Sequence, residues 1–144
     1  MIERLKREHR NFESELDEAG NHMYRNNDIV GGIRIMRNMS EFILQHAVEE
    51  EVRLMRVIMQ YAKDDSSDSI RIIQEHNYVL DFFKNKLRSI EENTISLNSK
   101  SQQESEEEEF NQKNKLNQFI TNLKSHFTEE EQIVFPLSLK ANSP

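Results

Sequence analysis

The sequence predicts an all-α protein, an antiparallel up-down-up-down four-helix bundle in a single domain of residues 1–144. Helix breakers are few, because the chain has only three glycines and two prolines. Apolar residues recur in steps of three and four in four separate segments, and no segment alternates as a strand would. Each helix alone would be marginally stable, so we expect the four stripes to share one core.

The first two helices are predicted on either side of a polar break, "RNND". Asp28 at its end is a suitable N-cap for the second helix, which should run to the cluster "KDDSSDS". The first helix, over residues 1–25, has the stripe Ile2, Leu5, Phe12, Leu16, Ala19 and Met23. The second has the stripe Ile29, Ile33, Met36, Met39, Ile43, Leu54, Val57 and Tyr61.

The third and fourth helices are predicted on either side of "NTISLNSKSQQESEEEE". Asp68 or Ser69 is expected to cap the third, and Ser105 with Glu108 fits a capping box for the fourth. Pro136 is expected to end the fourth helix, leaving a short tail. The third stripe is Ile73, Leu80, Phe83, Leu87 and Ile90. The fourth is Leu116, Phe119, Ile120, Leu123, Phe127, Ile133 and Val134.

Composition narrows the classes of function. The net charge of -7 argues against broad nucleic-acid binding, which needs a cationic surface. The chain has no cysteine, which excludes disulfides and cysteine-ligated metals, so any metal must have nitrogen and oxygen ligands. No apolar run approaches the roughly 20 residues of a membrane helix, and "MIERLKREHRNF" lacks the apolar core of a signal peptide. We therefore expect a soluble, cytoplasmic protein without a nucleic-acid or membrane partner; a protein partner is unknown.

Histidines and glutamates interrupt the apolar stripes at equivalent points. Every stripe contains one histidine, and the second and fourth add a glutamate four residues later. A lone histidine there is usually a satisfied core residue. A buried carboxylate without a partner, however, costs several kcal/mol, and a cation removes that cost. The residues are His9, His46, Glu50, His76, His126 and Glu130.

The spacing of these residues suits a metal site. Residues four apart lie on one helical face, about 6 Å apart along the axis, so each histidine–glutamate pair can reach neighbouring metals with the carboxylate as a bridge. Imidazole with carboxylate favours iron, manganese or zinc over magnesium or calcium. Four imidazoles and two carboxylates suit two iron ions, with Mn or Zn as possible substitutes.

Four motifs then resemble the hemerythrin-like family, also called the hemerythrin HHE cation-binding domain. They are "KREHRNF", "QHAVEEE", "QEHNYVL" and "HFTEEEQIVFP", and together they extend over nearly the whole chain. The resemblance implies that the six residues ligate a non-haem di-iron centre with an oxo or hydroxo bridge. It also implies dioxygen, nitric oxide or peroxide as small ligands, and roles in sensing, iron handling or the response to oxidative and nitrosative stress.

The chain departs from the oxygen-carrying members of that family. They have a second histidine one turn after the first in the third helix, where this chain has Leu80. They end with His-x-x-x-x-Asp, whereas this chain offers Glu130 and Glu131, of which Glu130 lies on the stripe. The departures put reversible oxygen transport in doubt. We expect a non-enzymatic di-iron binding protein. The alternatives are a di-iron enzyme that acts on peroxide or oxidises ferrous iron, and a metal-free helical interaction module.

Several other residues have two interpretations. His22 is either a fifth histidine ligand or a surface residue. Glu13, Glu49 and Glu51 are expected to face solvent. The phenols of Tyr24, Tyr61 and Tyr78 lie either near the metals or, as we expect, in core or rim packing.

Overall fold

The described residues of the computed structural model, 1–55, 66–95 and 102–141, form four helical rods. The first rod is α1 (Ile2–Tyr24), and the second is α2 (Ile29–Glu50) with the π-helical turn η1 (Glu51–Met55). The third consists of α4 (Ser66–Asp81), η2 (Phe82–Lys86) and α5 (Leu87–Ile95). The fourth consists of α6 (Gln102–Glu129), η4 (Glu130–Val134) and α7 (Phe135–Ala141).

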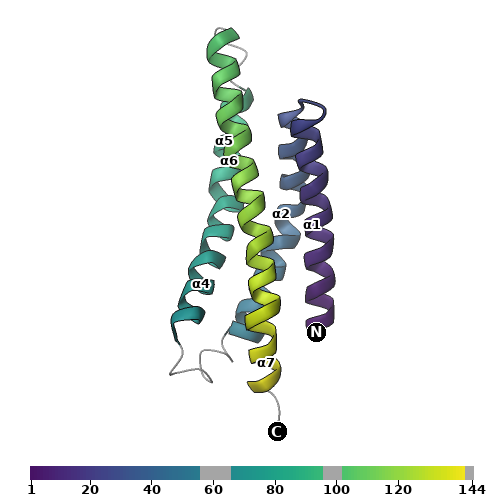
Figure 1. Cartoon of the computed structure of the whole chain (residues 1–144), viewed down its shortest axis with the longest axis vertical. Helices are drawn as coiled ribbons and strands as arrows, with labels where there is room; N and C mark the ends of the chain where they lie inside the picture. The colour runs from purple at the N-terminus through teal and green to yellow at the C-terminus, as the bar shows by residue number, and fades with distance from the viewer. Residues whose placement is uncertain (56–65, 96–101, 142–144) are drawn as a thin grey trace.

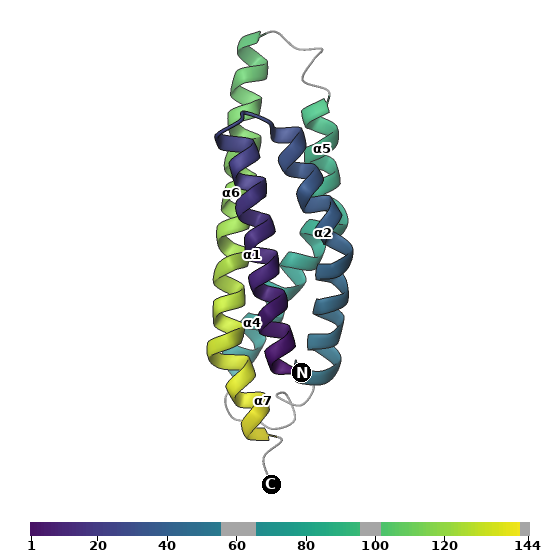
Figure 2. The same ribbon diagram turned by 90° about the vertical axis from the view of Figure 1, so that its right-hand side faces the viewer.

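The rods lie side by side along the long axis of the molecule, and the start of α1 lies at the same end as α7 (Figures 1 and 2). No strand occurs in the described ranges, which confirms the all-helical class. Within the same ranges, no helix is long and apolar enough to cross a membrane.

The turn between α1 and α2 forms as the sequence predicts. The side chain of Asp28 accepts a hydrogen bond from the backbone N–H of Gly31 at 2.9 Å, which confirms Asp28 as the N-cap. Asn27 before it has a φ of 52°, a left-handed conformation that asparagine tolerates better than most residues.

Two apolar clusters fill the bundle, with a polar layer between them. The larger cluster includes Phe12, Ile43, Val79 and Phe127, and the smaller cluster contains Leu5, Leu54, Ile72, Val134 and Phe135. On each rod, the predicted histidine lies between a residue of the larger cluster and a residue of the smaller one. The apolar side chains therefore shield the histidines from water along the axis of the bundle.

The stripe predicted for the third helix is confirmed at Phe83, Leu87 and Ile90 and was wrong by one position at its other two members. Ile72 and Val79 are buried, whereas Ile73 and Leu80 are only partly buried. Both positions offer two adjacent apolar residues, so hydrophobic periodicity alone does not choose between them. The corrected stripe still contains His76, which lies four residues after Ile72.

Two predicted helix starts were also wrong. The helices α4 and α6 run from Ser66 and Gln102, so Asp68, Ser69 and Ser105 lie within helical backbone and do not precede the helices as N-caps would. Val57 and Tyr61, which were expected on the second helix, lie outside the described residues.

Pro136 does not end the fourth helix. The backbone N–H of Phe135 donates to the carbonyl of Glu130, which closes the π-helical turn η4, and α7 continues to Ala141. Pro136 is the second residue of α7, where a backbone N–H would have no partner within that helix. The fourth rod thus continues past the proline, which follows the π-helical turn by two residues.

Candidate metal centre

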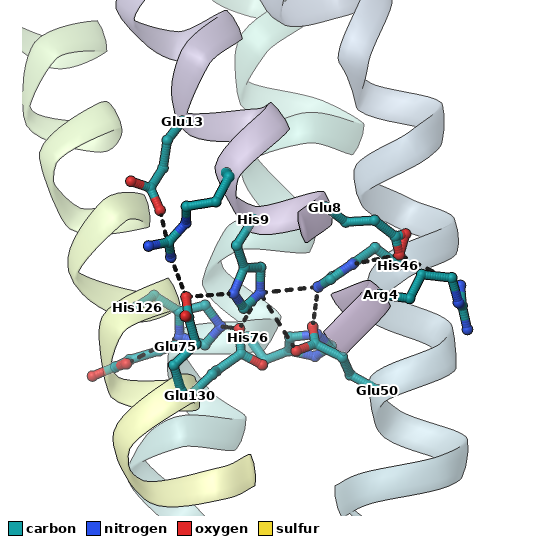
Figure 3. A network of polar contacts seen from close by, with 12 residues as sticks. Arg4, Glu8, His9, Glu13, His46, Glu50, Glu75, His76, His126 and Glu130 are labelled. Atoms are coloured by element: carbon teal, nitrogen blue, oxygen red, sulfur yellow. Dashed lines mark hydrogen bonds and ion pairs between the residues drawn. The ribbon is translucent and has the colours of Figure 1, made fainter. Parts of the chain in front are cut away.

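The structure brings all six predicted residues together in the polar layer. Their exposed fractions are at most 4%. One histidine comes from each rod, and the two glutamates come from the second and fourth rods (Figure 3). The six residues are His9, His46, Glu50, His76, His126 and Glu130.

One side of the centre has three donor atoms close together. Nε2 of His9 lies 3.0 Å from Nε2 of His46, which lies 3.2 Å from a carboxylate oxygen of Glu50. The ligand atoms of this group all lie within 4.8 Å of one another. Two ligands at right angles on a metal, each about 2.1 Å from it, would be about 3 Å apart. These three residues therefore have the spacing of a cation site.

The other side is more open. Nε2 of His126 lies 3.1 Å from Glu130, and Nε2 of His76 lies 3.7 Å from Glu50, while the two imidazole rings have centroids 5.9 Å apart. His9 connects the two sides, since its Nε2 lies 3.5 Å from Glu130 and 3.8 Å from Glu50. Both glutamates therefore lie between the two groups of histidines.

Unsatisfied polar atoms indicate that a cation fits between these side chains. Five buried atoms of the centre form no hydrogen bond of normal geometry with the described residues, although Nε2 of His126 lies 3.1 Å from Oε1 of Glu130. They are Nε2 of His76, Nε2 of His126, Oε2 of Glu50 and both carboxylate oxygens of Glu130. Buried polar groups normally find a partner, because leaving one unpaired costs about 1–3 kcal/mol. All five atoms are nitrogen or oxygen donors of the types that bind transition metals.

Protons balance the buried charges in the metal-free chain. Burial lowers the pKa of His9, but contacts with Glu130 and Glu50 outweigh burial and raise this pKa to about 10. Burial likewise lowers the pKa of His126, but its contacts with Glu130, Glu75 and Glu50 together outweigh burial and raise this pKa to about 9. Burial raises the pKa of Glu50, yet contacts with Glu130 and the histidines outweigh burial and hold this pKa well below its ordinary value.

Each histidine also contacts a carboxylate on the outer side of its ring, a feature that we did not predict. The other ring nitrogen, Nδ1, lies 3.0–3.2 Å from a glutamate of a neighbouring rod. The pairs are His9 with Glu131, His46 with Glu8, His76 with Glu51, and His126 with Glu75. Because a carboxylate accepts, Nδ1 carries the proton, and the lone pair of a neutral ring is on Nε2, toward the centre. We call these four glutamates the outer carboxylates.

Two of the glutamates expected in solvent therefore have other partners. Glu51 is an outer carboxylate, although its side chain is 45% exposed. Glu49 forms an ion pair with Arg4, with one N–O distance of 2.8 Å. Glu13 forms a 2.8 Å ion pair with Arg10 and does not reach the centre.

A repeated pattern in the sequence could have revealed the outer carboxylates. Arg4, Glu8 and His9 recur as Arg71, Glu75 and His76, and "HAVEEE" recurs as "HFTEEE". The two arginines have equivalent partners. Arg4 lies 3.5 Å from Glu8 and also binds Glu49. Arg71 lies 3.9 Å from Glu75 and 4.0 Å from Glu129. The two halves of the centre thus repeat one set of contacts.

Other candidate residues lie outside the centre. His22 is near the far end of α1, 3.4 Å from Asp28, and does not join the six residues. The Tyr24 hydroxyl donates to the backbone carbonyl of Lys113 at 3.1 Å. Tyr78 is exposed and packs against Phe119, and Tyr61 lies outside the described residues.

Comparison with family models gives one decisive match. The model of the hemerythrin HHE cation-binding domain matches residues 1–138. The chain belongs to the hemerythrin HHE cation-binding domain family. Neither the curated proteins nor the solved structures gave a match. Membership in the hemerythrin family implies cation binding, and the buried histidine–glutamate centre provides a suitable donor set in this chain.

Proposed function

We propose that this hemerythrin-like protein holds two iron ions in a non-haem di-iron centre, with Mn or Zn as possible substitutes. The proposal rests on five nitrogen and oxygen atoms that could ligate a metal and that form no hydrogen bond of normal geometry with the described residues. They belong to a group of four buried imidazoles and two buried carboxylates. Imidazole and carboxylate together suit iron better than magnesium or calcium, and two cations would offset the charges of Glu50 and Glu130.

The distances support an assignment of ligands to two positions. His9 and His46 would hold one ion, and His76 and His126 the other, with Glu50 and Glu130 shared between them. An up-down-up-down arrangement of the rods fits this assignment, because it lets each rod present one histidine at the same level of the bundle.

The surrounding side chains would keep the centre dry and the ligands in place. The ring of His9 stacks on Phe127, with centroids 4.3 Å apart, and also lies parallel to Phe135 at 5.7 Å. When bound, iron would supply one-electron chemistry and a binding position for dioxygen, nitric oxide or peroxide. We therefore propose a binding role in sensing, iron handling or the response to oxidative and nitrosative stress.

A second candidate function, oxidation of ferrous iron by dioxygen or peroxide, is favoured by two clefts at the rim of the centre. A cleft of about 400 Å³ reaches His126 and has Glu75 on its wall, and a cleft of about 300 Å³ reaches His46 and has Glu8 on its wall. The smaller cleft is lined by Glu8, Glu15 and Glu49 with Arg4, so its wall has an excess of negative charge that would attract a cationic substrate, whereas Arg71 balances Glu75 in the larger cleft. Steady consumption of peroxide or ferrous iron in many turnovers per chain would support the enzyme over the binding protein.

Anaerobic reconstitution with ferrous iron tests the di-iron proposal. The purified chain should retain about two iron ions after desalting and develop a visible charge-transfer band on exposure to air. A His126→Ala variant should retain less iron and lose the band. Retention of less than about one iron ion per chain, without a visible band, would overturn the proposal.

A further inference from the structure

The two proposed metal positions have different surroundings, although their contacts repeat. We call the site at His9, His46 and Glu50 the first position and the site at His76 and His126 the second. The first position needs little rearrangement to receive a cation, because its three ligand atoms are already close together. There His9, His46 and Glu50 already have their ligand atoms within 4.8 Å of one another. On the other side, the Nε2 atoms of His76 and His126 form no hydrogen bond of normal geometry with the described residues and lie 3.7 Å from Glu50 and 3.1 Å from Glu130, respectively.

The outer carboxylates of the first position are fixed by arginines. Glu131, which contacts His9, also forms an ion pair with Arg10, and its side chain is 18% exposed. Glu8, which contacts His46, lies 3.5 Å from Arg4. When an arginine fixes the position of an outer carboxylate, the hydrogen bond that the imidazole donates to that carboxylate restricts the rotation of the imidazole ring. The ring of His9 is therefore held by its stacking on Phe127 and by the contact of its outer nitrogen with Glu131.

The outer carboxylates of the second position are held less firmly. The side chain of Glu51, which contacts His76, is 45% exposed, and it forms no ion pair with an arginine or lysine in the described part of the chain. Glu75, which contacts His126, lies 3.9 Å from Arg71. In the repeated sequence pattern, Asn77 stands at the position that corresponds to Arg10. The second metal position therefore has no counterpart of the arginine that binds Glu131 at the first position.

From these differences we infer that the outer carboxylates are positioning residues that make the two metal positions unequal. The position at His9, His46 and Glu50 fills first, and the position at His76 and His126 fills second. This inference rests on the proposed function, since it concerns the order in which that same centre takes up metal.

Titration of the metal-free chain with Co²⁺, followed by NMR, tests the order of filling. Co²⁺ is paramagnetic and broadens the signals of nearby ring protons. With less than one Co²⁺ per chain, the ring signals of His9 and His46 should broaden before those of His76 and His126. Equal broadening of all four rings at every ratio would overturn the inference and leave the proposed function intact. Failure of the chain to bind Co²⁺ and Fe²⁺ at all would overturn both.

Two matched variants test the role of the outer carboxylates. Glu131→Gln should weaken the first binding step by about 10- to 100-fold, and Glu51→Gln should weaken only the second step. The exposed Glu92, which pairs with Arg88 on the surface, provides the control, and Glu92→Gln should leave both steps unchanged. Calorimetric titration with Co²⁺ resolves the two steps, and ¹⁵N NMR of the metal-free variants reports the histidine tautomers. Equal weakening of the same step by Glu131→Gln and Glu51→Gln would contradict the inference.

Discussion

The Nε2 atoms of His9 and His46 face each other at 3.0 Å, although each ring uses its Nδ1–H to bind a carboxylate. Two lone pairs at this distance would repel, so a proton must lie between the two nitrogens. Contacts with Glu130 and Glu50 raise the pKa of His9 to about 10, so His9 is the ring that carries the extra proton. In the metal-free chain, a proton thus occupies the place that we assign to a cation.

The raised histidine pKa values predict how the stability of the metal-free chain depends on pH. His9 and His126 have pKa values of about 10 and 9, above the ordinary 6.5, so protons bind the folded state more tightly. Their contribution is complete below pH 6.5 and is lost as the pH rises through 9 and 10. We expect the melting temperature to fall by about 5 °C or more between pH 6.5 and 9.5.

The lowered pKa of Glu50 predicts a loss of stability on the acid side as well. Its contribution is present above the ordinary value of 4.5 and disappears as the pH falls through the lower pKa of the folded state. The metal-free chain should therefore be most stable between about pH 4.5 and 6.5. Thermal unfolding followed by circular dichroism measures both trends. A melting temperature that rises from pH 6.5 to 9.5 would be inconsistent with a protonated His9.

Metal loading should release the protons that the centre holds. At pH 7.5, His9 and His126 are both charged in the metal-free chain, and a ligating imidazole must be neutral. Filling both positions should therefore release at least about two protons per chain. A pH indicator in weakly buffered solution, titrated with Zn²⁺, measures the number released. Above pH 10 the release should approach zero, and uptake of metal at pH 7.5 without proton release would contradict the assignment.

The six central residues could be predicted because each lies on an apolar stripe. Helical phase distinguishes Glu50 from its two neighbours, and the structure confirms its burial, whereas Glu49 and Glu51 remain partly exposed. Their role as metal ligands remains a prediction. The outer carboxylates could not be predicted in this way, because each is next to a stripe residue on its own helix but contacts a histidine of another helix. Only the packing of the rods brings those side chains together.

The errors at Pro136 and in the apolar stripe of the third helix have a different cause from the missed outer carboxylates. A proline usually ends a helix, but here α7 continues through Pro136 to Ala141 after the π-helical turn η4. A π-helical turn has one more residue between its hydrogen-bonded partners than an α-helical turn has. The spacing of the apolar residues did not reveal this extra residue. The stripe of the third helix was ambiguous because Ile72–Ile73 and Val79–Leu80 each offer two apolar residues.

Two glycines provide a matched test of how closely α1 and α2 pack. A Cβ on Gly32 would lie 2.6 Å from the side chain of Met23 and 2.9 Å from the backbone carbonyl of Ala19, which cannot easily move. A Cβ on Gly20, in α1, would have no neighbour within 4 Å. Gly20→Ala should therefore raise the free energy of unfolding by about 0.5–1 kcal/mol, whereas Gly32→Ala should lower it by about 1–3 kcal/mol. Urea unfolding at pH 6 measures both, and equal effects of the two substitutions would show that the helices are not in close contact at Gly32.

His46 and His22 provide a matched test of the centre itself, since the two histidines differ in burial and in neighbours. His46 is buried and lies 3.2 Å from Glu50, whereas the side chain of His22 is 35% exposed and lies beside Asp28, away from the centre. His46→Ala should weaken binding of the first metal ion by at least about 100-fold, because it removes a ligand atom. His22→Ala should leave both binding steps within about twofold of the wild type. Titration of each metal-free variant with Co²⁺ distinguishes the two, and circular dichroism verifies that both are folded. A loss of metal binding in His22→Ala as large as in His46→Ala would mean that the cation lies elsewhere, because no rearrangement of one ring could bring His22 to the six central residues.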